Sequence, residues 1–498
     1  MDIFFPYETS ACIDLIFALV TNYTVKATTV VELSLSRFFK RQYSSLFRAI
    51  GGYFTSRHNK EARTEERIKV RDRTKSFLFK SAIEGDNGVH SFAIDITGNV
   101  KKHSLKSEGR SYIHSGSIGG MSIGHNYSVI GKKEDDGCGW MLPVAIDRVP
   151  HSENKFDFSV IQAESVLDKV PKGDISIIVG DSAYSCNKFI YNLSKRENVV
   201  VVTRMRANKA IYEKYNDKKE GSGRKRKYGK KYLLNKLDLL PNPDYVEEFK
   251  KTTKKGLVLK IRLFLFKGYI CRGNKDYTMS EIPINFIRAE VFKENGEKKY
   301  DRDLWIGIAG KARDKVSILH VFKEYADRFD LEHFFKFSKS KLLMDKMQSS
   351  DPKKDEDFML MTGVAYHVLC KSADLLDKIN IRPWENKKTI KAKSPSNIFR
   401  AASVSDVFDQ VYTGKIKKRG MPDERSIRKS FTSKQNQPIL RKVRDPTKLQ
   451  VEIKSSFGKS PIISKTSINI QQESKEIFRK KILDKADEIY DKIHIKVA

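Results

Sequence analysis

The sequence predicts a mixed α/β fold, because segments typical of β-strands alternate with helical segments from about residue 76 onward. Three short apolar runs stand out as strands, SFAIDI at Ser91–Ile96, ISIIVG at Ile175–Gly180 and VVVVTR at Val199–Arg204. Helices fit between these runs at Ser159–Lys169 and Asn187–Arg196. Hydrophobic residues make up 39% of the chain, which is enough to build a buried core around such a sheet.

Two further strands are expected at Gly119–Ile130 and Trp140–Val149. The core would then consist of three strands, a helix, a strand, a helix and a strand. This is the order of a ribonuclease H-like sheet, although many other α/β folds share parts of it.

The charge of the chain indicates a polyanionic partner. Lysine and arginine number 95 against 62 aspartate and glutamate residues, a net charge of +33. Nucleic acid is the first candidate, because each phosphate neutralised by a cation releases a counterion. A membrane surface is the competing candidate, but we find neither a signal peptide nor an apolar run of roughly 20 residues. The five cysteines form no CxxC pair, which fits a reducing cytoplasm and suggests no metal or redox role.

The first 75 residues are expected to form a helical domain. Apolar spacing predicts helices at Ala11–Val20 and Val30–Phe54. The second helix would project the cations Arg37, Lys40 and Arg41 from one face. A small DNA-binding domain and an ordinary helical lobe with a solvated basic face explain this pattern equally well.

The remaining segments complete the predicted organisation. Residues 76–206 would form the first part of the core, residues 207–310 a β-rich insertion with strand-like runs at Leu257–Phe266 and Ile282–Phe292, and residues 311–377 the second part of the core, with helices at Lys315–Met347 and Asp357–Asp377. Residues 378–498 would form a basic C-terminal region with a terminal helix at Ile470–Ile493. The insertion also carries a basic loop with the cations Arg224, Lys225, Arg226 and Lys227.

Two aspartates are placed where a metal site could form. Asp95 is expected to end the first core strand, and Asp181 directly follows the run ISIIVG. Strand ends of an α/β sheet converge at one edge, so the two carboxylates could approach a shared metal ion. Taken singly, an aspartate after a strand is more often a turn or helix-cap residue. The pair together favours a site.

A polar stripe on a downstream helix supplies a third carboxylate. Tyr325, Arg328, Glu332 and Lys339 stand at i, i+3, i+7 and i+14, which keeps them within an arc of about 60° on one continuous helix. The alternative interpretation is a solvated face with an Arg–Glu pair. The apolar residues expected to pack against the sheet are Phe329, Leu331, Phe334, Phe335 and Phe337.

This stripe matches the pattern Y-x2-R-x3-E-x6-K at every position, and in this respect the chain resembles the DDE-class insertion-sequence transposases of bacteria and archaea. Other segments are similar to the same family: AIDITGNVKKHS, GDSAYS, RMRANKAIY, RKRKYG and INIRPWE. The resemblance covers roughly residues 30–442. It implies a ribonuclease H-like core with a β-rich insertion, and a location in the cytoplasm, at the nucleoid.

The resemblance also implies roles for the stripe and the aspartates. Asp95, Asp181 and Glu332 would be the catalytic triad that binds Mg²⁺, with Mn²⁺ as a substitute, and Tyr325, Arg328 and Lys339 would contact DNA near the cut. The enzyme would bind the terminal inverted repeats of its own element as double-stranded DNA, cleave the strands and join them to target DNA. Acting on two ends implies a homodimer in the DNA complex.

Further DNA contacts are expected beside the triad. Arg204 and Arg206 would face the same groove, with a basic strand edge as the alternative. Trp305 could stack on an unpaired base, although core packing explains it better. Two other functions stay open at this point: a ribonuclease H-like nuclease without strand transfer, and a catalytically inactive DNA-binding protein descended from a transposase.

Overall fold

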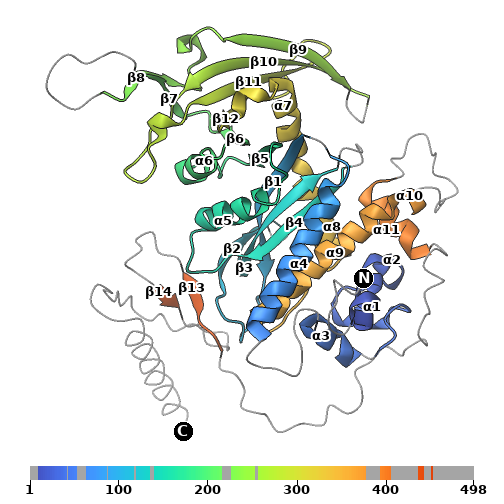
Figure 1. Cartoon of the computed structure of the whole chain (residues 1–498). Coiled ribbons are helices and arrows are strands. Elements are labelled where there is room, and N and C mark those ends of the chain that lie inside the picture. Colours follow the sequence, from blue (N-terminus) through green and yellow to red (C-terminus); the bar gives the residue numbers. More distant parts are fainter. Residues whose placement is uncertain are drawn as a thin grey trace, which may run out of the picture.

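The computed structural model shows one large mixed sheet with helices packed against it (Figure 1). The expected terminal helix at 470–493, the segment around Trp384, and Arg224 and Lys225 lie outside the described residues. The residues that the structure describes are 9–41, 43–52, 63–86, 88–116, 119–134, 139–215, 226–252, 256–376, 393–404, 436–441 and 450–452.

The centre of the sheet has the strand order β4-β3-β1-β5-β6. The β1–β3 and β3–β4 pairs are antiparallel, whereas the β1–β5 and β5–β6 pairs are parallel. Helix α5 connects β4 to β5, and α6 connects β5 to β6, so the predicted order of these elements is confirmed, except that an unpredicted short strand at Ser111–Ser115 lies between β1 and β3. The bounds are β1 Val89–Val100, β3 Gly120–Lys133, β4 Met141–Arg148, α5 Lys155–Leu167, β5 Ile175–Gly180, α6 Asn187–Leu193 and β6 Val199–Met205.

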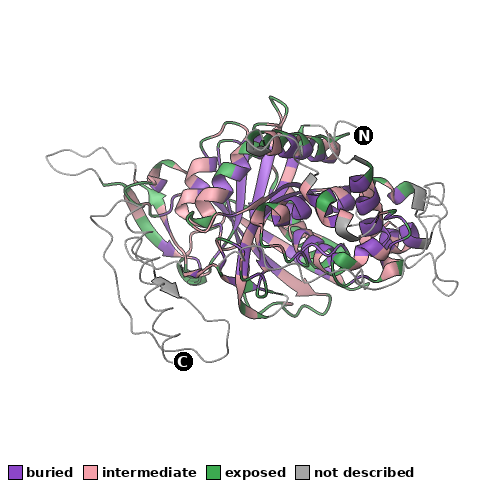
Figure 2. Cartoon of the chain, turned by 90° about the horizontal axis from the view of Figure 1, so that it is seen from below, coloured by how far each residue is buried: buried purple, intermediate pink, exposed green. Residues whose placement is uncertain are grey.

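Strands β5 and β6 are almost continuously apolar because both of their faces are buried. Ile178 and Val201 belong to the main hydrophobic core, whereas Ile177 and Val200 point into a second core on the opposite face. Figure 2 shows the buried residues concentrated along the central strands and on the helix sides that face them. Asp181 therefore directly follows a strand, β5, that is packed on both faces.

The region expected as a β-rich insertion extends the main sheet instead of forming a separate subdomain. Strand β12 pairs antiparallel with β6, and β11, β10 and β9 follow in order. Only β7 and β8 form a second, two-stranded sheet within the described residues. The bounds are β7 Ala210–Lys214, β8 Tyr228–Leu233, β9 Tyr245–Thr252, β10 Val258–Tyr269, β11 Ile284–Lys293 and β12 Leu304–Ala309.

At the opposite edge, the sheet contains strands that the sequence did not predict. β2 (Ser111–Ser115) pairs antiparallel with β3 and parallel with β13 (Ile439–Arg441). β13 in turn pairs with β14 (Gln450–Glu452). These strands are short, and the last two come from the polar region after residue 377, so no apolar run marks them.

The N-terminal helices pack on the core rather than forming a detached domain. α1 (Thr9–Val20) and α3 (Tyr43–Gly52) contact α9 (Pro352–Lys371), and α11 (Pro395–Val404) joins them. The helix expected at Val30–Phe54 is divided into a 3-10 turn, Val31–Leu35, and α3. A short helix, α2 (Asn22–Val25), follows α1.

Helix α4 (Arg63–Ile83) packs on β4, so the expected domain boundary at residue 75 falls inside a helix of the core. Arg67 and Arg71 of this helix bind Asp357 of α9, with 2.8 and 3.0 Å between the closest charged atoms. The ion pairs tie α4 to α9. No helix of the described residues is long and apolar enough to cross a membrane.

The long helix expected at Lys315–Met347 is two helices, α7 (Ile318–Asp327) and α8 (Phe329–Lys341), which meet at Arg328. The next expected helix, Asp357–Asp377, begins earlier, at Pro352. There the Asp351 side chain caps it by accepting a hydrogen bond from the Lys353 amide at 3.0 Å. A last short helix, α10, spans Ala373–Leu376.

Candidate active site

Asp95 lies on β1, and Asp181 directly follows the parallel neighbour of β1, β5. The parallel register pairs Ala93 of β1 with Val179 of β5, so continuing it by two residues aligns the two aspartates. Asp95 does not end its strand as expected, because β1 continues to Val100 along its other neighbour, β3. Only the pairing with β5 stops at Ala93. The two carboxylates therefore lie where the gap between the two strands begins to open.

Local hydrogen bonds hold each aspartate. Asp95 Oδ1 accepts a hydrogen bond from the Ile96 amide at 2.7 Å, and Asp181 Oδ1 accepts one from the Ala183 amide at 2.8 Å. Gly180 permits the turn that follows β5, because a Cβ atom there would lie 2.7 Å from Cβ of Tyr184. The segment GDSAYS thus folds back tightly beneath Asp181.

The pKa of Asp95 is affected by both of the other predicted acids. Its pKa is raised to about 6, chiefly by burial and to a smaller extent by the negative charges of Asp181 and Glu332. The Ile96 amide and the Arg328 guanidinium act in the opposite direction. The three acids and Arg328 are therefore near enough to act on one another electrostatically. No group of three or more His, Cys, Asp or Glu side chains is close enough to hold a metal ion within the part of the chain that the structure describes.

Glu332 lies in the first turn of α8 and binds Arg328, with 3.3 Å between Glu332 Oε1 and Arg328 Nη2. The Arg328 guanidinium also lies 5.8 Å from the ring centre of Tyr325. Its side chain is only 11% exposed, and its Nε and Nη1 atoms are buried without a hydrogen-bond partner among the described residues. Arg328 thus keeps unused donors beside the carboxylates.

Tyr325 and Arg204 belong to the same neighbourhood. Burial raises the pKa of Tyr325, the Arg328 and Arg204 charges lower it, and the Asp181 charge raises it. Arg204 and Arg206 are exposed near the end of β6, the neighbour of β5. The charges of Arg328, Arg204 and Asp181 therefore all act on Tyr325, although these residues come from the α7–α8 junction, β6 and the segment after β5.

Lys339 lies farther along β1. Its ammonium donates a hydrogen bond to the Gly98 carbonyl at 2.9 Å, and burial lowers its pKa. The predicted stripe assumed one continuous helix, but α7 and α8 are separate elements. Lys339 and Glu332 share α8, whereas Tyr325 lies on α7.

The predicted apolar face of α8 is confirmed for Leu331, Phe334, Phe335 and Phe337, which are all buried. The prediction for Phe329 was wrong. Phe329 is the first residue of α8, is 50% exposed, and packs edge-on against His333 rather than against the sheet.

Trp305 corrects another expectation. The ring is 3% exposed, lies 5.8 Å from the Phe266 ring, and stands opposite Met205 in the β12–β6 pair. An unpaired base cannot stack on a ring buried between strands. The core-packing alternative is therefore right, and Trp305 is removed from the candidate DNA contacts.

The other predicted basic residues lie away from the triad in sequence and have different surroundings. Arg226 and Lys227 are exposed, and the Arg226 guanidinium lies over the Tyr215 ring at 5.2 Å. Arg37 and Lys40 are exposed near the N-terminal helices. Arg41 binds Asp14 at 3.0 Å, so part of the expected basic face is neutralised within the protein.

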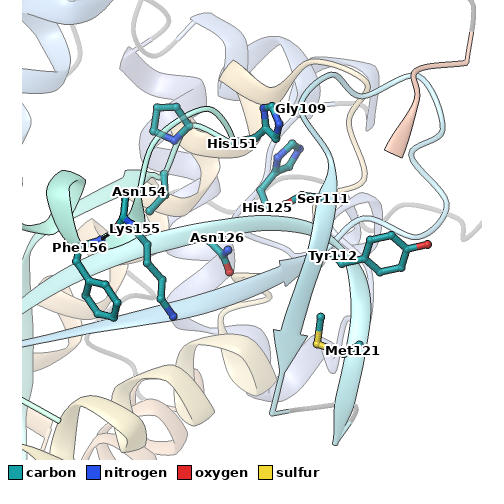
Figure 3. A pocket seen from close by; sticks show the side chains of 12 residues that line it. Gly109, Ser111, Tyr112, Met121, His125, Asn126, His151, Asn154, Lys155 and Phe156 are labelled. Atoms are coloured by element: carbon teal, nitrogen blue, oxygen red, sulfur yellow. Dashed lines mark hydrogen bonds between the residues drawn. The ribbon is translucent and has the colours of Figure 1, made fainter. Parts of the chain in front are cut away.

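Sequence reasoning missed Tyr184 as a part of the site, although it lies in the quoted segment GDSAYS. The side chain is buried, and its ring contacts Phe156 at 5.5 Å and Phe189 at 4.9 Å. Burial raises its pKa, and the charges of Asp95 and Asp181 add to this effect. Tyr184 is thus buried near enough to both aspartates for their charges to act on it, and the Phe156 ring that it contacts lines a cavity at the start of α5 (Figure 3).

Comparisons with known proteins give no match in sequence and a distant similarity in structure. No protein family matches the chain. No curated protein is significantly similar to it in sequence. Among solved structures, the chain is similar to piggyBac transposase in a synaptic complex with hairpin DNA, determined by cryo-EM. The identity is 11%, the match covers 83% of this chain and 78% of that one, and the TM-score is 0.38.

Proposed function

We propose that this chain is a DDE-class DNA transposase, which cleaves and transfers DNA strands with divalent metal ions. The observation that carries the proposal is the placement of Asp95 and Asp181 at the same level of two neighbouring parallel strands, with Glu332 close enough to affect the charge of Asp95. One carboxylate on β1, one directly after β5 and one on α8 form the set that the sequence resemblance implies.

The donor chemistry suits Mg²⁺, with Mn²⁺ as a substitute, because these ions prefer carboxylate oxygens. Among the described residues the acids are not close enough to hold an ion, so the three side chains would have to move together to bind one. The supporting observation is that the charges of Asp181 and Glu332 add to the larger effect of burial in raising the pKa of Asp95, because a cation between the carboxylates would offset their repulsion. When bound, two such ions supply activation of water or a 3′-hydroxyl and stabilisation of the leaving oxygen. Asp95, Asp181 and Glu332 would hold them.

The cations beside the triad suit a phosphate backbone. Arg328 has two buried donor atoms without partners among the described residues, and a guanidinium fork matches phosphate geometry. Arg204 is exposed on the same side, next to Tyr325. In the proposed mechanism, Arg328 orients Glu332 and contacts the phosphate at the cut, while Arg204 and Tyr325 hold the flanking strand.

The strand order β4-β3-β1-β5-β6 supports the ribonuclease H-like part of the proposal, because its mixture of antiparallel and parallel pairs is the arrangement expected of that core. The net charge of +33 suits double-stranded DNA as partner, both transposon ends and target. Joining two ends requires a homodimer in the working complex.

The test uses purified protein, Mg²⁺ and a plasmid that carries the gene with its flanks. Glu332→Gln removes one proposed metal ligand, and Glu294→Gln, at an exposed position after β11, is the matched control. We expect excised and joined ends from the unmodified protein and from Glu294→Gln, but none from Glu332→Gln. Cleavage without joining would indicate a nuclease instead. Binding without cleavage under any divalent ion would indicate a DNA-binding protein that has lost its activity.

A further inference from the structure

Strand β9 is the last strand at one end of the main sheet (Figure 1). Its inner side pairs antiparallel with β10 along its whole length, and no strand of the described residues pairs with its outer side. The backbone amide and carbonyl groups on the outer side can therefore bond a further strand. Tyr245 and Val246, at the start of β9, are 52% and 44% exposed, so the side chains of this edge also face solvent.

The charges of β9 follow an order that is complementary to itself. Two glutamates, Glu247 and Glu248, precede Phe249, and two lysines, Lys250 and Lys251, follow it. A second copy of the strand that runs antiparallel beside the first presents the same residues in reverse order. When the two Phe249 residues stand opposite each other, each of the four glutamates faces a lysine of the other copy.

The charges also distinguish this register from its neighbours. Two antiparallel edges related by a twofold axis show the same face of the sheet, so one residue stands opposite its own copy. A register centred on Glu248 would place two negative charges directly opposite each other, and one centred on Lys250 would place two positive charges there. Like charges at opposite positions destabilise a strand pair, and opposite charges stabilise it. The register centred on Phe249 is therefore favoured.

The side chains needed for these pairs are accessible. Lys250 and Lys251 are exposed, Glu247 is half-buried, and none of the three has an ion-pair partner within the described ranges. Glu248 already binds Lys260 of β10 at 2.9 Å, so it contributes less to a new contact. Glu247 and Lys251 are thus the pair whose charges a second copy can satisfy.

Phe249 supplies an apolar centre for the same edge. Its ring contacts Phe322 of α7 edge-on at 6.0 Å, which holds it on the face of the sheet that packs against the second core. The ring stays partly exposed. A second Phe249 directly opposite would cover part of that exposed surface, because side chains at opposite positions of an antiparallel pair are in contact.

Charges on an edge strand often prevent pairing, and this alternative has to be weighed. Such protection works when an approaching copy meets charges of its own sign. The two glutamates and two lysines of β9 sum to zero, whereas the whole chain carries +33 and repels a second copy elsewhere. A neutral and self-complementary edge is therefore a place where two copies can approach.

We propose that two copies of this chain associate by antiparallel pairing of their β9 strands, centred on Phe249, so that one sheet continues across the twofold axis. The inference gives a surface to the homodimer of the proposed function, but it rests on the pairing and charges of β9 alone. A single strand edge is a small interface, so the association depends on concentration.

Charge reversal tests the pairing without DNA or metal, by sedimentation velocity over a range of protein concentrations. In about 0.15 M salt, which screens the net charge of the chain, we expect the unmodified protein to form dimers as its concentration rises. Glu247→Lys and Lys251→Glu should each weaken self-association at least about tenfold, because like charges then stand opposite each other. An equimolar mixture of the two variants should recover dimers, since each reversed charge faces its opposite. A folding defect would not be repaired by mixing.

The matched controls are Glu294→Lys and Lys267→Glu, at exposed positions after β11 and near the end of β10, which should leave dimerisation unchanged. A cysteine checks the register. Phe249→Cys places two thiols directly opposite each other, within reach of a disulfide, so mild oxidation should give a covalent dimer. Tyr245→Cys should give none, because two copies of this position would stand about 27 Å apart.

A protein that stays monomeric at every concentration, or a dimer that both reversals leave unchanged, would overturn the inference. Failure of the mixed variants to associate would do the same. Dimers with this charge pattern in a protein that never cleaves its plasmid would support the interface and reject only the proposed enzyme. Cleavage by a protein without this self-association would reject the interface and leave the proposed enzyme standing.

Discussion

Asp95 on β1 stands level with Asp181 after β5, two residues beyond the last paired positions, Ala93 and Val179. Both aspartates therefore lie just beyond the point where the backbone pairing between β1 and β5 ends. Burial and the charges of Asp181 and Glu332 raise the pKa of Asp95 to about 6. Changes in a neighbouring charge, or in the backbone that carries Asp181, should therefore alter the pKa of Asp95.

Asp181→Asn should lower the pKa of Asp95, because it removes a neighbouring negative charge that raises it. Titration of the Asp95 carboxyl by NMR measures the shift. The same variant should lose metal-dependent cleavage, and Asp168→Asn, at an exposed position after α5, should change neither property. Cleavage by the Asp181→Asn protein at the normal rate would defeat the assignment of the triad.

Metal affinity should depend on pH through Asp95. The carboxyl holds its proton below about pH 6, and a metal ion must displace that proton to bind. Affinity for Mn²⁺ should therefore be steady above about pH 6 and fall by up to about tenfold per pH unit below it. Titration calorimetry over this range gives the profile. A flat profile would mean that Asp95 is not a ligand.

The raised pKa of Asp95 also affects folding. A carboxyl whose pKa is higher in the folded than in the unfolded chain binds more protons when folded, so its contribution to stability falls as the pH rises from about 4 to about 6. Asp95→Asn should remove that loss and make the protein more stable than the unmodified chain above about pH 6. Urea unfolding at two pH values tests the sign, and a destabilised variant would contradict it.

Gly180→Ala should disturb the site through the backbone. The new Cβ would lie 2.7 Å from Cβ of Tyr184, so the turn that carries Asp181 must shift. We expect a loss of about 1 to 3 kcal/mol in unfolding free energy and at least a tenfold slower cleavage. Gly116→Ala is the control, because nothing lies within 4 Å of a Cβ there. Equal behaviour of the two variants would show that the turn is not strained by the added methyl group.

Asp357→Ala should destabilise the protein by about 1 to 3 kcal/mol, because it removes the closest carboxylate of Arg67 and Arg71 in a buried setting and leaves them Glu356 at 3.0 Å and Asp147 at 3.6 Å. Chemical unfolding measures this loss. The exposed pair partner Asp168 provides the comparison, since Asp168→Ala should change stability by less than about 1 kcal/mol. A small effect of Asp357→Ala would mean that Glu356 holds α4 to α9 without Asp357.

Trp305→Phe should retain cleavage and DNA binding within a few-fold of the unmodified protein, because the ring fills the core and does not face DNA. Trp305→Ala should cost about 3 to 5 kcal/mol of stability through the cavity it leaves. Cleavage assays and thermal unfolding separate the two effects. Selective loss of DNA affinity in a stable Trp305→Phe protein would restore the base-stacking role.

The sequence by itself determined the local features of the fold. Alternating and continuous apolar runs predict β1, β3, β4, β5 and β6 and the helices between them, because side-chain periodicity follows directly from backbone geometry. The same reasoning placed Asp181 directly after a buried strand and four of the five apolar residues of α8 in the core. These predictions need only neighbours along the chain.

Tertiary structure alone decided which distant segments meet. The pairing of β12 with β6 turns an expected subdomain into part of the sheet, and the junction at Arg328 separates Tyr325 from the rest of its stripe. The burial of Trp305 and the cavity beside Phe156 likewise depend on residues far apart in the sequence. A strand edge can pair with many other strands, and an aromatic ring can pack against many other side chains. Only the packing of the whole chain selects one partner for each.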